Sequence, residues 1–145
     1  MVGFLFDTNL VSEATKDKAS PRVTAWLAAI NSREAYLSVI TASELRAGAE
    51  LMPHGARRRR FEQWIAYDIL QRFKPNILNV DLSVAESFGR YLAEDRLRGR
   101  TTSPVDLLIA ATAKAHDLTL VTRNTRDFNH LGVKLLNPWI EDTRM

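Results

Sequence analysis

The sequence predicts an α/β fold with a mostly parallel central sheet of about five strands flanked by helices, in a single domain that spans residues 1–145. Two observations support this class. Short apolar runs of strand length alternate with longer segments whose apolar residues recur every three or four positions. Parallel strands joined by crossover helices produce this alternation. In such sheets ligands bind beyond the carboxyl ends of the strands, so polar residues at those ends are the candidate functional residues.

Five apolar runs predict the strands. The first run, residues 2–6, ends directly on an acid, Asp7, which precedes a short helical pattern. The third run follows the helix-ending pair Pro75-Asn76, and the last follows a predicted turn at 127–130. The predicted strands span residues 2–6, 35–39, 77–80, 118–121 and 133–136.

Capping residues and helix breakers predict where the helices begin and end. Ser20-Pro21 and Ser103-Pro104 each combine a Ser N-cap with Pro at the first helical position, where the missing N–H has no intrahelical partner to lose. Pro53-His54-Gly55 separates two further helices. The predicted helices span residues 20–30, 41–51, 56–73, 83–98 and 103–116. The longest of them carries an apolar stripe that consists of Phe61, Ile65, Ile69 and Phe73.

The composition narrows the classes of function. Because the chain has no cysteine, it has neither disulfides nor thiolate metal sites, which fits a reducing cytoplasm. No run of about 18 apolar residues predicts a transmembrane helix, and residues 1–6 lack the features of a signal peptide. The net charge is +3, and 15 of the 20 basic residues are Arg, which binds phosphate more effectively than Lys. This balance permits a nucleic-acid partner without requiring one.

Four acids lie where predicted strands end or predicted helices begin. Asp7 directly follows the first strand, and Asp127 comes six residues after the strand 118–121. Glu44 and Asp106 each fall in the first turn of a predicted helix. Because the carboxyl ends of parallel strands meet at one edge of the sheet, this fold can bring all four carboxylates into one cleft.

A purely structural interpretation also exists for each acid. The stretches Thr41-Ala42-Ser43-Glu44 and Ser103-Pro104-Val105-Asp106 have the form of capping boxes, in which the acid stabilises the start of a helix. Asp7 can cap the helix that follows it, and Asp127 can begin a turn. Helix capping alone therefore accounts for the position of each acid taken singly.

Burial favours a functional role for two of the acids. Residues 105–113 are nearly all apolar, which predicts a helix that is buried on most sides, and Asp106 lies at its mouth. Asp7 likewise ends a buried strand. A carboxylate in either position must face a cleft, since burial of an unpaired charge costs desolvation free energy.

Four carboxylates in one cleft repel one another and require a counter-charge. No His or Cys pattern with metal-ligand spacing accompanies them. A site with oxygen ligands alone suits Mg²⁺ or Mn²⁺ rather than Zn²⁺. Such ions bind phosphate oxygens and lower the pKa of a coordinated water, so the chemistry indicated is metal-dependent hydrolysis of a phosphodiester. No side chain stands out as a general base.

Five motifs, in order along nearly the whole chain, carry a resemblance to a known family. They are FLFDTNLVSE, LSVITASELRAGA, TSPVDLLIAATAKAHDLTLVTRN, TRDF and LNPW. With these motifs the sequence resembles the PIN-domain ribonucleases, and within them the VapC-type toxins of the FitB-like group. The resemblance implies a PIN-like fold and a metal-dependent endoribonuclease that is the toxin of a type II toxin–antitoxin system.

The resemblance also implies the site residues and the partners. Asp7 and Asp106 match the firmest metal ligands of the family, and Glu44 and Asp127 match its other two acids. The positions that line the family's site correspond here to Thr8, Thr122 and Asn124. The implied partners are an RNA substrate, a second copy of the chain in a homodimer, and a cognate antitoxin that inserts into the active site. DNA is implied only indirectly, through the antitoxin.

The basic residues closest to the acids are the candidate substrate contacts. Arg123 and Arg126 lie between the strand 118–121 and Asp127, and Arg46 lies on the helix of Glu44. The run Arg57–Arg60 carries more charge, but it lies farther from the acids along the chain, and its role stays open. Contacts of this kind to RNA phosphates weaken with salt.

Three alternatives remain at this point. An aspartyl-phosphate phosphatase would use Asp7 as a nucleophile. Such enzymes usually have a second acid two residues later and a nearby Lys, whereas this chain has Asn9 at that position and its nearest lysine is Lys114. A non-catalytic PIN-like module would dock an antitoxin or another partner peptide without hydrolysis. If all four acids were only helix caps, Asp7→Asn would reduce stability and leave activity unchanged.

Overall fold

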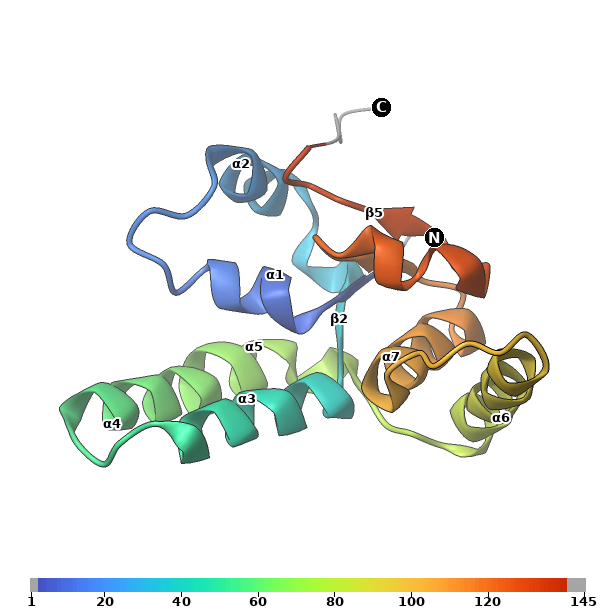
Figure 1. Ribbon diagram of the computed structural model, residues 1–145. Coiled ribbons are helices and arrows are strands. Elements are labelled where there is room, and N and C mark those ends of the chain that lie inside the picture. Colours follow the sequence, from blue (N-terminus) through green and yellow to red (C-terminus); the bar gives the residue numbers. More distant parts are fainter. Residues whose placement is uncertain (1–2, 141–145) are drawn as a thin grey trace.

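The computed structural model describes residues 3–140 and shows a five-stranded sheet in which every pair of neighbouring strands is parallel (Figure 1). The strand order is β3-β2-β1-β4-β5, so the first strand lies at the centre. The strands are β1 (Phe4–Phe6), β2 (Ala35–Ser38), β3 (Ile77–Leu78), β4 (Thr119–Val121) and β5 (Leu135–Leu136). The predicted fold class is confirmed. Val2, with which the first predicted strand begins, lies outside the described residues.

Seven α-helices of the described chain pack around this sheet, and several shorter helical turns connect the elements. The α-helices are α1 (Thr8–Glu13), α2 (Pro21–Ala29), α3 (Val39–Leu51), α4 (Ala56–Gln63), α5 (Gln71–Phe73), α6 (Leu82–Leu97) and α7 (Pro104–Ala115). The 3₁₀ turns are η1 (Ser32–Glu34), η3 (Lys74–Asn76), η4 (Thr125–Asp127) and η5 (Asn129–Leu131), and η2 (Trp64–Leu70) is a π-helical segment. None of the helices within residues 3–140 combines the length and the apolarity needed to cross a membrane.

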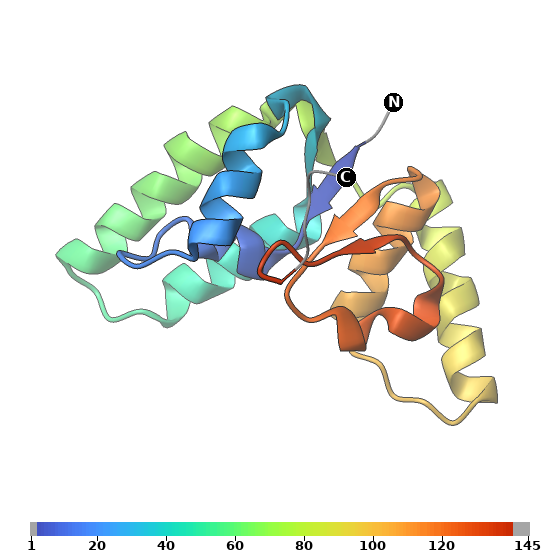
Figure 2. The same cartoon turned by 90° about the horizontal axis from the view of Figure 1, so that it is seen from above.

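The sheet separates two hydrophobic cores. Figure 2 shows α1 to α5 on one side of the strands and α6 with α7 on the other. Successive residues of β1 face opposite sides, as the pleat requires: Phe6 packs in the core beneath α1 to α5, whereas Leu5 packs in the core beneath α6 and α7. Burial on both faces explains why the strand is apolar without alternation.

The helix predicted over residues 56–73 is continuous but not uniform, because its central part, η2, is a π-helix. Its buried residues recur every four positions, at Ile65, Ile69 and Phe73. An α-helix turns once in 3.6 residues, so a stripe with a period of four drifts off the buried face. A wider π turn removes this drift, which explains the local geometry.

Two helix starts differ from the prediction. Helix α3 begins at Val39 rather than at Thr41, because the hydroxyl of Ser38 accepts a 3.0 Å hydrogen bond from Ile40 N–H and caps the helix. The capping box predicted for Thr41 and Glu44 is therefore wrong. Helix α6 likewise begins at Leu82, where the carboxylate of Asp81 accepts from Val84 N–H, and not at Ser83.

Candidate active site

Asp7 ends the central strand and is held from three directions. Its N–H donates to Val121 O on β4 at 3.0 Å. Its Oδ1 accepts from Thr8 N–H at 2.8 Å, and its Oδ2 accepts from Thr122 Oγ1 at 2.7 Å. The residue is only 9% exposed. Asp7 does cap α1, as the structural interpretation requires, but the cap uses one oxygen and leaves lone pairs on both oxygens free to accept further bonds.

Glu44 is tied to the end of β1 by a side-chain hydrogen bond. Thr8 Oγ1 donates to Glu44 Oε1 at 2.5 Å, although the two residues are 36 positions apart in the chain. Because α3 begins at Val39, Glu44 lies in the second turn of its helix rather than in the first. Its carboxylate therefore does not cap α3 and faces the end of the central strand.

Thr122 connects the end of β4 to this site. Besides its bond to Asp7, its hydroxyl oxygen accepts from Asn9 Nδ2 at 3.3 Å and from Asn124 N–H at 3.1 Å. Thr8 and Thr122 thus contact the acids directly. Asn124 contributes its backbone N–H and keeps an exposed side chain.

The electrostatics of Asp106 indicate that the four acids lie close together. Burial, followed by the negative charges of Asp7, Asp127 and Glu44, raises the pKa of Asp106 to about 6. Burial also raises the pKa of Asp7, against the opposing effects of its hydrogen bonds to Thr122 and Thr8, and the charge of Asp127 adds to the rise. The charges of the three other predicted acids thus all act on Asp106, which indicates that the four lie near one another. Ser103 makes no side-chain cap on α7, so the second predicted capping box is also wrong.

No basic side chain neutralises this cleft within residues 3–140, where every ion pair lies elsewhere. Arg46, predicted as a substrate contact, pairs with Glu62 at 2.5 Å and with Glu50 at 3.4 Å. Its charge is therefore directed to α4. Of the run Arg57–Arg60, Arg58 is half-buried and pairs with the same two glutamates. Arg126 is exposed on η4.

The donor set of the cleft suits a hard divalent cation. All of its charged groups are carboxylates, and their mutual repulsion would be relieved by a positive ion. Over the described part of the chain, no three His, Cys, Asp or Glu side chains form a ready-made metal shell. Mg²⁺ does not need one, since it is usually bound through one or two carboxylates and completes its octahedron with water and substrate phosphate. The residues present therefore fit such an ion.

Sequence analysis missed two polar residues of this region, Asn9 and Asn137. Asn9 links Thr122 to the backbone N–H of Arg123, which donates to Asn9 Oδ1 at 3.4 Å. Asn137 is 5% exposed and donates from Nδ2 to Arg123 O at 3.3 Å. The available signal was their position: each lies within three residues of the end of a strand at the carboxyl edge of the sheet.

A parallel α/β sheet with Asp7 directly after its central strand, and with Glu44, Asp106 and Asp127 on the helices and turns around it, is typical of α/β nucleases with an acidic site. Residues 4–134 match the PIN domain, and the chain belongs to the PIN-domain family.

Similar proteins with known names cover almost the whole chain. The chain is 36% identical over 135 residues to the VapC ribonuclease Y4jK of Sinorhizobium fredii, which spans 93% of this chain and 96% of that protein. It is also 36% identical to the toxin FitB of Neisseria gonorrhoeae, over 93% of this chain and 97% of FitB. Among solved structures, that of FitAB bound to an IR36 DNA fragment superimposes with a TM-score of 0.89 at 33% identity, covering 98% of this chain and 99% of that one.

Proposed function

We propose that this chain is a metal-dependent endoribonuclease that hydrolyses RNA phosphodiester bonds and acts as the toxin of a toxin–antitoxin pair. The observation that supports the proposal is that the charges of Asp7, Asp127 and Glu44 all raise the pKa of Asp106. The similar proteins support the substrate, since one is a VapC ribonuclease and another is the toxin FitB. Action on RNA also implies a cytoplasmic location.

The chain's own residues would hold the ion and orient the substrate around it. Asp7, fixed by Thr122 and by the N–H of Thr8, would bind the ion from the strand side, and Asp106 would bind it from α7. Glu44, oriented by Thr8, and Asp127 would complete the shell directly or through water. When bound, Mg²⁺ or Mn²⁺ supplies Lewis acidity toward phosphate oxygens and activates water.

Purified protein is expected to cut a mixed tRNA and rRNA substrate with Mg²⁺ or Mn²⁺ and to stop when EDTA is added. Asp7→Asn should reduce the cleavage rate about 10³-fold, because loss of several kcal/mol of transition-state stabilisation by the ion corresponds to that factor. Glu86→Gln is the matched control. Glu86 is an exposed acid near the start of α6 that pairs with Arg90 at 3.8 Å.

Cleavage by Asp7→Asn at the wild-type rate would attribute the activity to a contaminant and leave Asp7 with the structural role of capping α1. Absence of cleavage by the wild type on any RNA would instead favour the non-catalytic module that docks a partner. The Glu86→Gln protein, purified in parallel, should cleave at the wild-type rate, which shows that neutralising an acid outside the site does not by itself reduce activity.

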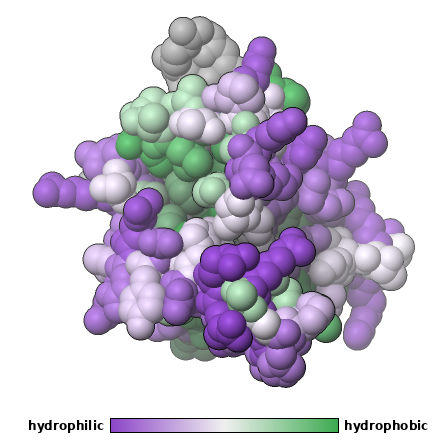
Figure 3. Space-filling view, turned by 90° about the vertical axis from the view of Figure 1, so that its left-hand side faces the viewer, coloured by the Kyte–Doolittle hydropathy of each residue, from purple (hydrophilic) through white to green (hydrophobic). Residues whose placement is uncertain are grey.

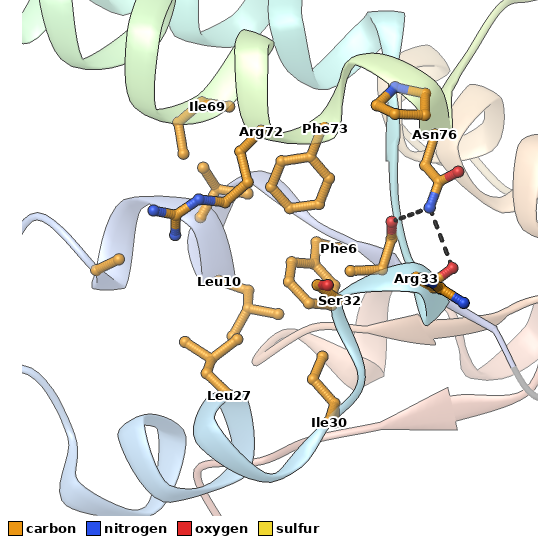
Figure 4. A pocket seen from close by; sticks show the side chains of 14 residues that line it. Phe6, Leu10, Leu27, Ile30, Ser32, Arg33, Ile69, Arg72, Phe73 and Asn76 are labelled. Carbon is orange, nitrogen blue, oxygen red and sulfur yellow. Dashed lines mark hydrogen bonds between the residues drawn. The ribbon is translucent and has the colours of Figure 1, made fainter.

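An apolar groove that none of the four acids lines is a second candidate site for the antitoxin, in addition to the active site that the resemblance implies. On the side shown in Figure 3, apolar residues gather in a recess between hydrophilic ones. The groove has a volume of about 580 Å³ and lies between α1 and α2 on one side and η2 with α5 on the other. Figure 4 shows its apolar lining and the two cations beside it. The lining of the groove includes Phe6, Leu10, Leu27, Ile30, Arg33 and Arg72.

We propose that this groove binds an apolar segment of a cognate antitoxin that also carries a carboxylate. The lining supplies apolar area, and Arg33 and Arg72 supply the complementary charge. The solved complex of FitAB is consistent with a partner protein of this kind, and its DNA fragment is consistent with DNA contacts made by the assembly. A homodimer of the chain completes the proposed assembly.

Leu27→Glu is expected to prevent binding of the cognate antitoxin while RNA cleavage changes less than about twofold. The new carboxylate would remove apolar contact area from the groove and repel the carboxylate proposed on the antitoxin segment, which costs several kcal/mol on complex formation. Size-exclusion chromatography of the mixed proteins measures binding. Leu51→Glu is the control, since Leu51 is 86% exposed at the end of α3 and does not line the groove. Co-elution of Leu27→Glu with the antitoxin would place the partner on another surface.

A further inference from the structure

The segment that follows β5, Asn137 to Ile140, lies against the end of β4, and the proposed mechanism does not use it. Asn137 is nearly fully buried. Its Nδ2 donates to Arg123 O at 3.3 Å, and its Oδ1 accepts from Trp139 N–H at 2.9 Å. From the opposite side, Asn9 Oδ1 accepts from Arg123 N–H at 3.4 Å. The backbone of Arg123 is therefore held at both its N–H and its C=O, by residues from α1 and from the segment after β5.

The side chain of Arg123 is held as well. Its guanidinium carbon lies 5.6 Å from the centre of the Trp139 ring, within the range of a cation–π contact. Trp139 is half-buried and packs against the core that contains Phe6 and Trp26, so the ring provides a fixed surface. Arg123 itself is exposed, and over residues 3–140 no carboxylate lies within ion-pair distance of it.

Arg123 lies in the chain between two parts of the proposed acidic site. Arg123 directly follows Thr122, whose hydroxyl donates to Asp7, and it precedes η4, which carries Asp127. A cleft of four carboxylates repels a phosphodiester backbone. Arg123, one residue after Thr122, supplies a cation that attracts this backbone, and its charge also contributes, after hydrogen bonds, to the lowered pKa of Glu13 on α1. A guanidinium that stacks on a ring still presents N–H groups at its edge for phosphate oxygens.

We propose that Asn9, Asn137 and Trp139 form a clamp that positions the guanidinium of Arg123 to bind an RNA phosphate next to the acidic cleft. This inference rests on the proposed ribonuclease function. Arg123 is the substrate contact, and the three clamp residues are positioning residues that act through it. A preorganised side chain loses less rotamer entropy when it binds, so the clamp converts an ordinary surface Arg into a stronger phosphate contact. The LNPW motif, which ends in Trp139, gains a function in this way.

Binding of a fluorescein-labelled single-stranded RNA, measured by anisotropy in Mg²⁺ buffer, tests the clamp. Every protein carries Asp7→Asn, so that binding is measured without cleavage. Adding Arg123→Ala should raise Kd about 5- to 10-fold and reduce the slope of log Kd against log salt by about one phosphate contact. Trp139→Leu should raise Kd by a similar factor, and Trp139→Phe, which retains a ring, should restore most of the affinity.

Coupling between the two positions separates the clamp from a merely structural role of Trp139. The protein with both Arg123→Ala and Trp139→Leu should bind no more weakly than Arg123→Ala alone, because Trp139 acts only through the guanidinium. Trp64→Leu is the matched control. Trp64 stacks on Phe61 with ring centres 5.6 Å apart, away from the cleft, so its loss reduces stability without a change in Kd. Arg126→Ala, an exposed neighbour on η4, should have a smaller effect than Arg123→Ala.

An additive double variant, or an RNA affinity that does not change with Trp139→Leu, would overturn the clamp. That result leaves the proposed nuclease intact, since cleavage is measured separately on proteins with Asp7. Conversely, a wild type that cuts no RNA would contradict the nuclease, while the anisotropy data still decide whether the clamp serves RNA binding.

Discussion

Asp106→Asn is expected to abolish cleavage and, in EDTA, to make the protein more stable. The loss of a metal ligand should reduce the cleavage rate about 10³-fold. The gain in stability follows from the pKa of Asp106, which burial and the three neighbouring acids raise from 3.8 to about 6 in the folded state. The folded protein holds this proton more tightly than the unfolded chain, so the free energy of unfolding falls as the pH rises from about 4 to 6 and is constant above that.

At pH 7.5 the ionised Asp106 therefore destabilises the metal-free protein, and a neutral Asn does not. After allowance for solvent screening the difference is about 1 kcal/mol, or roughly 2–4 °C in Tm, measured by thermal unfolding in EDTA. Added Mg²⁺ should reverse the order, since it binds the folded wild type more tightly than the variant.

A second buried acid, Asp95, provides a control for which the expected change in Tm has the opposite sign. Asp95 is 6% exposed, accepts from Thr102 N–H at 2.9 Å, and its pKa is lowered chiefly by hydrogen bonds from Thr102. Asp95→Asn should therefore lower Tm at neutral pH, whereas Asp106→Asn raises it. If Asp106→Asn lowered Tm by as much, its carboxylate would be a structural group and its assignment to the metal site would be wrong.

The parts of this structure that local patterns determine could be predicted from the sequence. Strand β1 is apolar without alternation because both of its faces are buried, and α7 begins where Ser103-Pro104 marks it. The carboxyl ends of parallel strands share one edge of the sheet, so the ends of the predicted strands also located Asp7 and Asp127. Strand ends do not place Asp106, since α7 follows α6, and its approach to the other three acids depends on how α7 packs.

The helix caps could not be predicted in the same way, because several nearby residues were each able to cap the same helix. Three stretches, at Thr41, Ser83 and Ser103, have the form of a capping box, and none of the three Ser or Thr side chains caps its helix. Residues two or three positions upstream cap α3 and α6 instead, at Ser38 and Asp81. Which residue caps each helix depends on where the preceding strand or loop ends in space, and this is set by tertiary packing.

Hydrogen bonds between residues far apart in the sequence could not be predicted from the sequence either. Thr122 contacts Asp7 and Asn9 at separations of 115 and 113 residues, and Asn137 contacts Arg123 across the gap between β4 and β5. Asn and Thr are common in turns, so their residue types alone give no reason to select these positions.

The affinity of the cleft for Mn²⁺ is expected to fall about tenfold between pH 7 and pH 5. Only the ionised carboxylate binds a metal ion, so below its pKa a proton competes, and each further pH unit weakens binding by about a factor of ten. With a pKa of about 6, Asp106 is mostly ionised at pH 7 and mostly protonated at pH 5. Calorimetric titration with Mn²⁺ measures both the affinity and, in buffers of different ionisation enthalpy, the protons released.

Asp106→Asn isolates the contribution of this one carboxylate. The variant should bind Mn²⁺ more weakly at pH 7, with a smaller decline toward pH 5 and fewer protons released near pH 6, because the group that titrates there is gone. Ordinary carboxylates titrate near pH 4 and would leave the affinity almost constant over this range. A wild-type affinity for Mn²⁺ that is unchanged from pH 7 to pH 5 would therefore show that Asp106 is not buried beside the other three carboxylates when the ion binds. The acidic site would then have to open before the ion binds.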